Sequence, residues 1–183
     1  LVAQAAAWTR LPAPSGPQVA VLSGSGGGGA VASDLVGESG LQAATLSPAT
    51  VQTLLALMPE AAAHLPFDLG AVPGPSRATP DWLRQVLETM LADPDVGAGL
   101  FLMTTMPEMA ATAATVVDIN RASAKPVAFV NAASSAGAEA GAKLKAEGLV
   151  NFANIKEALG YLRNRLAWER YDNEALAPDS KAQ

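Results

Sequence analysis

The stretch that decides the fold runs from Val19 to Asp34 and reads Val-Ala-Val-Leu-Ser-Gly-Ser-Gly-Gly-Gly-Gly-Ala-Val-Ala-Ser-Asp. It begins as an apolar run, breaks into glycines and resumes with helical spacing. This pattern predicts a buried strand, a tight turn and a helix over residues 29–39. Because four successive glycines carry no Cβ, the backbone of the turn can adopt positive φ and approach a ligand closely.

The start of this helix allows two interpretations. The first N–H groups of a helix have no partner within it and carry the positive end of the helix dipole, so this start suits a phosphate or another anion. The predicted anion-binding residues are then Ser25, Gly26, Gly27, Gly28 and Gly29. The alternative is a tight turn that binds nothing, since glycine-rich turns occur in many α/β proteins.

The composition fits one α/β domain and excludes several classes of site. The chain has 183 residues, of which 50% are hydrophobic, which is enough for a substantial core. It has no cysteine and one histidine, which excludes disulfides, thiolate catalysis and a multi-histidine metal site. With a net charge of -5 and no Lys/Arg cluster, we expect no nucleic-acid partner. No run approaches the roughly 20 apolar residues that cross a bilayer, so we predict a cytoplasmic protein without a membrane partner.

Strand and helix patterns alternate along the rest of the sequence. Apolar runs bounded by turn residues predict further strands, and apolar stripes at helical spacing predict the helices between them. We expect strands at 41–46, 97–104, 126–130 and 149–152, and helices at 48–58, 80–92, 107–124, 136–147 and 155–171. Residues 60–78 have no periodic pattern and are expected to be irregular.

This alternation predicts a flavodoxin-like α/β fold, a three-layer, doubly wound parallel sheet of about five strands in the order 2-1-3-4-5. Residues 18–172 are expected to form the domain. Residues 1–17 are predicted to be a linker or the end of a preceding element, and residues 173–183 a polar tail.

In this strand order a crevice opens between the carboxyl ends of the first and third predicted strands. Its predicted walls are Ser23 with the glycine turn on one side and Thr104 with Thr105 on the other. The turn satisfies Gly-x-Gly-x-x-Gly, but no carboxylate follows about 20 residues later, and no Gly-Lys-Ser/Thr motif is present. The turn therefore supplies backbone donors without charged side chains, and we predict neither a catalytic residue nor a metal site in this segment.

Several motifs, taken in order, resemble one enzyme family over about residues 19–166. After the predicted first strand and its glycine turn, the sequence contains the motifs Gly40-Leu41, Leu46-Ser-Pro-Ala-Thr50, Asp93-Pro-Asp-Val96 and Lys125-Pro-Val127. The chain resembles the NDP-forming acyl-CoA synthetases, relatives of succinyl-CoA synthetase, and in particular one flavodoxin-like subdomain of these enzymes.

The resemblance implies a reaction in which acid, CoA and ATP give acyl-CoA, ADP and phosphate through a phosphohistidine. In this family two helix starts, one from each of two related subdomains, hold the phosphohistidine, and the turn from Ser25 to Gly29 matches one of them, the so-called power helix. ATP, Mg and CoA are implied for the full enzyme and not for this segment. The implied partners are CoA-binding and ATP-grasp domains or subunits of the same enzyme.

Two departures from the family pattern affect this function. The family carries its histidine in a Ser-His-Thr-Gly type motif, which is absent here, and His64 lies in Ala-His-Leu-Pro, so we assign it no catalytic role. Leu65 stands where relatives have Asn in Asn-Pro-Val-Asp, and an apolar side chain cannot make the hydrogen bonds of an amide. Asp68 of the same motif either caps a turn or contacts a ligand. The alternative function is a free-standing binding or interaction module without catalysis.

Overall fold

The computed structural model describes residues 2–57, 64–69, 79–103, 109–131, 145–146 and 148–176. Most of the helix predicted at 136–147 lies outside these ranges, although residues 145–146 are helical. Two predicted crevice residues, Thr104 and Thr105, also lie outside them.

The described residues form one six-stranded parallel sheet. Along it, β2 (Gln42–Ala43), β1 (Gln18–Ser23), β4 (Ala98–Met103), β5 (Val127–Asn131) and β6 (Asn151–Phe152) lie side by side in this order. These are the five predicted strands in the predicted order 2-1-3-4-5, so the flavodoxin-like fold is confirmed. The strand predicted at 41–46 is reduced to two residues.

A sixth strand, β3 (Phe67–Asp68), lies in the segment that was expected to be irregular. It pairs with the end of β1, where Leu22 faces Phe67 and Ser23 faces Asp68, whereas β2 pairs with the beginning of β1. The two short strands therefore share one edge of β1. The other edge of β1 pairs with β4.

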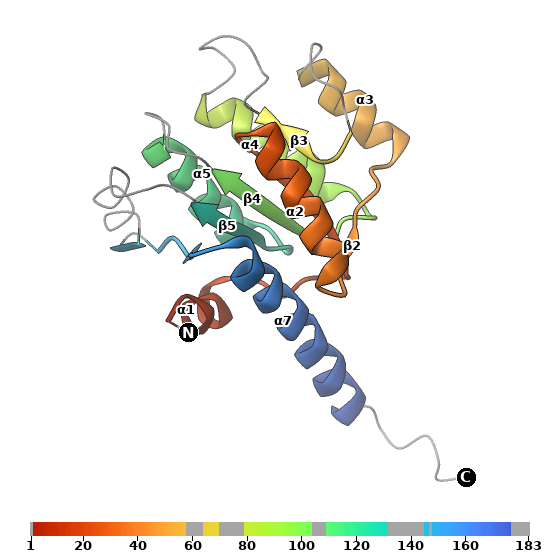
Figure 1. Ribbon diagram of the computed structural model, residues 1–183, viewed down its shortest axis with the longest axis vertical. Helices are drawn as coiled ribbons and strands as arrows, with labels where there is room; N and C mark the ends of the chain where they lie inside the picture. The colour runs from red at the N-terminus through yellow and green to blue at the C-terminus, as the bar shows by residue number, and fades with distance from the viewer. Residues whose placement is uncertain are drawn as a thin grey trace.

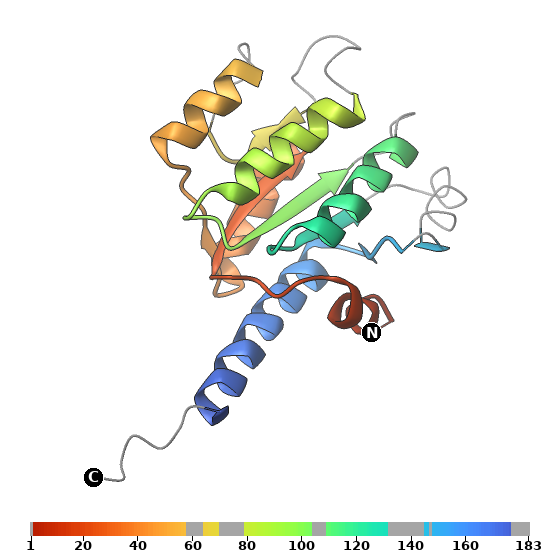
Figure 2. The ribbon, with the colours of Figure 1, turned by 180° about the vertical axis from the view of Figure 1, so that it is seen from behind.

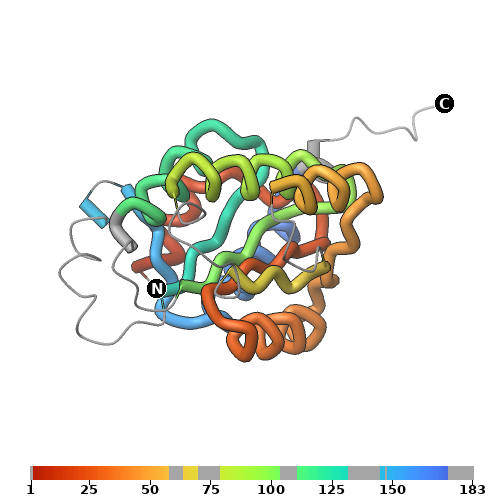
Figure 3. The backbone as a smooth tube through the Cα atoms, turned by 90° about the horizontal axis from the view of Figure 1, so that it is seen from above, coloured from red at the N-terminus to blue at the C-terminus, as the bar shows by residue number. Residues whose placement is uncertain are grey.

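Helices cover both faces of the sheet, as the view from above shows (Figure 3). One core contains residues of α3 (Pro48–Leu57), α4 (Pro80–Ala92) and α5 (Met109–Ala122). The other contains residues of α1 (Val2–Arg10), α2 (Gly26–Glu38) and α7 (Ile155–Leu176) (Figures 1 and 2). Strand β4 is buried along its whole length because it is covered on both faces, as its continuous apolar sequence predicts.

The segment between α1 and β1 is packed against the beginning of β4. Leu11 and Pro14 are buried, and the Ser15 N–H donates to the carbonyl oxygen of Gly97 over 3.1 Å. A Cβ on Gly97 would lie 2.3 Å from the carbonyl oxygen of Gly16, so the two backbones touch where glycine alone fits. Residues 11–17 are thus fixed to the sheet.

A buried polar network joins α3, α4 and β5 at the amino ends of the strands. The Asp93 side chain, 1% exposed, accepts hydrogen bonds from the N–H groups of Ser47 (2.8 Å) and Asp95 (2.9 Å), and the Lys125 ammonium donates to the Asp93 carbonyl oxygen (2.7 Å). Burial raises the pKa of the Asp93 carboxyl, but hydrogen bonds from Thr50, Ser47 and Asp95 outweigh it, so this pKa lies below its ordinary value. Burial lowers the pKa of Lys125, and the charge of Asp93 opposes this effect. The network is structural.

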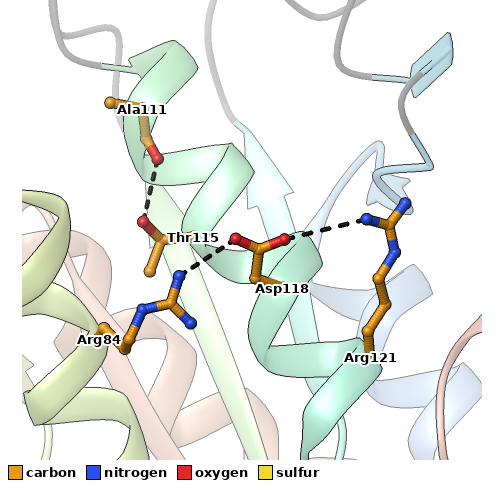
Figure 4. Close-up of polar contacts among 5 residues, drawn as sticks. All are labelled: Arg84, Ala111, Thr115, Asp118 and Arg121. Carbon is orange, nitrogen blue, oxygen red and sulfur yellow. Dashed lines mark hydrogen bonds and ion pairs between the residues drawn. The ribbon is translucent and has the colours of Figure 1, made fainter.

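On the outer surface, α4 and α5 are joined by exposed ion pairs (Figure 4). Arg84 lies 3.1 Å from Asp118, which also lies 3.9 Å from Arg121 one turn along α5. Exposed pairs of this kind contribute about 0 to 1 kcal/mol. They therefore stabilise the helix layer little.

Candidate functional site

The candidate site lies where β1 ends and α2 begins, at the carboxyl end of β1. Ser23 closes the strand with 1% exposure, and its hydroxyl donates to the carbonyl oxygen of Ser25 (2.7 Å) and accepts from the N–H of Ser25 (3.1 Å). The next N–H, that of Gly24, donates to the carbonyl oxygen of Leu102 on β4 over 2.9 Å. These bonds fix the turn to the sheet before the helix begins.

Helix α2 begins with its first N–H groups open. Ser25 is the N-cap residue, with φ −153° and ψ 125°, yet its side chain makes no capping hydrogen bond. The first hydrogen bond of the helix runs from the N–H of Gly29 to the carbonyl oxygen of Ser25 over 2.9 Å. Within the described ranges, the N–H groups of Gly26, Gly27 and Gly28 have no acceptor. Three donors therefore remain at the positive end of the helix dipole.

The structure corrects the conformation predicted for the glycines. They begin the helix at Gly26 instead of forming a turn before residue 29, and none has positive φ, which among the described residues occurs only at Gly40 and Gly148. Tertiary packing overrides the low helix propensity of glycine here. What these glycines provide is therefore not a left-handed backbone but the space that a Cβ atom would otherwise fill.

The four glycines differ in what a Cβ would meet. At Gly26 it would lie 2.8 Å from Oδ2 of Asp68, at Gly28 3.2 Å from Oγ of Ser23, and at Gly29 3.1 Å from Cβ of Pro66. At Gly27 it would meet nothing within 4 Å, and Gly26 and Gly27 are both exposed. Contacts with Ser23 and Pro66 thus account for the glycines at 28 and 29, whereas Gly26 meets only the mobile end of the Asp68 side chain and Gly27 faces open space.

The segment with β3 forms one wall of the site. Pairing of Ser23 with Asp68 brings the Asp68 carboxylate to the start of α2. Sequence reasoning named Ser23 and Asp68 but missed β3, although Pro66 and Asp68 had signalled this segment through the family motif. Leu65, which replaces the family's Asn, packs against the core around α3 and α4, and His64 is exposed. The opposite wall, predicted at Thr104 and Thr105, is not described.

The described residues of the site offer backbone donors and, beside them, the carboxylate of Asp68. The sequence has no lysine or arginine from residue 11 to residue 76, which spans the whole of β1, α2 and β3. The described residues contain no group of three His, Cys, Asp or Glu side chains that could hold a metal ion. The three open backbone donors suit a small anion, and the carboxylate of Asp68 opposes an anion that approaches from its side. In the described ranges, no helix is long and apolar enough to cross a membrane.

Comparison with known proteins shows that this chain is similar in fold to parts of several solved structures. No family model and no curated protein matches the sequence. Among solved structures, PH0766 from Pyrococcus horikoshii OT3 matches 92% of this chain with a TM-score of 0.74 and 22% identity. The dinucleotide forming acetyl-coenzyme A synthetase 1 of Ca. Korarchaeum cryptofilum matches 96% of this chain with a TM-score of 0.75. Identity is 22% in its complex with phosphate and ADP and 23% in its apo form.

The chain spans 39% of the length of each of these three structures. At 22% to 23% identity, the structural similarity establishes the fold alone. The same fold forms one part of the longer acetyl-coenzyme A synthetase chain. It supports the predicted family at the level of fold.

Proposed function

We propose that this chain is a module of an NDP-forming acyl-CoA synthetase and that the start of α2 holds a phosphohistidine supplied by another part of the enzyme. One observation carries the proposal: three N–H groups, of Gly26, Gly27 and Gly28, are open at the carboxyl end of β1. The fold it shares with part of an acetyl-coenzyme A synthetase supports this assignment. A cytoplasmic location belongs to the same proposal.

In the proposed reaction this chain binds and orients a phosphoryl group. Its backbone donors and helix dipole stabilise negative charge on the phosphoryl oxygens, both when the group rests on the histidine and when it is transferred. The missing Cβ of Gly27 leaves room for the phosphoryl group to approach. No lysine or arginine lies on β1, α2 or β3, so we expect weak binding that lets the group leave again. Acid, CoA and ATP would bind to the companion CoA-binding and ATP-grasp domains or subunits.

The second candidate function is a free-standing module that binds an anion without catalysis. It rests on the same open donors and on the absence of the family's histidine motif from the sequence. Reconstitution separates the two functions. A module of the enzyme restores acyl-CoA formation when it is added to companion domains that lack it, whereas a free-standing module does not.

The first test is titration of the chain with inorganic phosphate, followed by amide chemical shifts. We expect the N–H signals of Gly26, Gly27 and Gly28 to shift with a dissociation constant in the millimolar range, because β1, α2 and β3 carry no basic side chain. Shifts confined to other residues at tens of millimolar phosphate would show that the start of α2 binds no anion.

A further inference from the structure

We draw no further inference here: the strongest candidate, the cavity of about 370 Å³ between the end of α1, α5 and the segment before β6, carries none, because its two cations, Arg10 and Arg121, are exposed and lie in the last turns of α1 and α5, where a positive charge stabilises the end of its own helix without a ligand.

Discussion

Gly27→Ala should stabilise the fold and weaken anion binding. A Cβ at Gly27 meets nothing within 4 Å and the residue has helical φ, so the methyl group causes no clash. Alanine in place of a helical glycine stabilises by about 0.5 to 1 kcal/mol, which for a chain of this size raises the melting temperature by about 1 to 4 °C. The Cα–Cβ bond tilts toward the start of the helix, where it narrows the approach of an anion, so phosphate affinity should fall severalfold.

The matched control for this substitution is Gly37→Ala, near the far end of the same helix. Gly37 is also exposed, and a Cβ there would likewise meet nothing within 4 Å, so the substitution should stabilise the fold to a similar extent. Phosphate affinity, measured from the amide shifts of Gly26 and Gly28, should not change. Two results would refute this reasoning: a lower melting temperature for Gly27→Ala alone, or equal phosphate affinity in both variants.

Three further predictions concern the fold. Gly97→Ala should destabilise by about 2 kcal/mol or more in urea unfolding, because its Cβ would lie 2.3 Å from the Gly16 carbonyl oxygen; Gly160→Ala, in open space on α7, should not. The pKa of the Asp93 carboxyl is lower in the folded than in the unfolded chain, so its contribution to stability is present above the unfolded pKa and is lost as the pH falls through the folded pKa. In Asp93→Asn, the urea midpoint should therefore depend less on pH below about pH 4. Burial raises the pKa of Tyr161 to about 12, so stability should fall between pH 10 and 12, and Tyr161→Phe should remove this loss.

The order of the strands was predictable because each central strand is a continuous apolar run between turn residues. In Ala98–Met103 every residue is buried, and such a run admits few alternatives. Strand β3 was not predictable, because two residues have no periodicity and pair only through contact with the end of β1. The Asp93 network joins residues 32 and 46 positions apart, which no local pattern reveals.

The position of the candidate site was predictable, whereas its local conformation was not. The glycine run after an apolar strand located the start of α2, and the strand order placed it at the carboxyl edge of the sheet. Intrinsic propensity argued against four glycines in a helix, so positive φ was the natural expectation. The neighbours that Pro66 and Asp68 provide around Gly29 and Gly26 come from a segment about 40 residues away, which no local pattern reveals.

The central claim is that the start of α2 holds a phosphohistidine. The most direct measurement titrates the chain with a short peptide carrying a phosphohistidine, beside the same peptide without phosphate, and follows the phosphorus resonance and the backbone amides together. We predict that the phosphorylated peptide alone shifts the amides of Gly26, Gly27 and Gly28 and the phosphorus signal, and that Gly27→Ala reduces both shifts. Equal shifts with both peptides, or shifts confined to residues outside the start of α2, would contradict the claim.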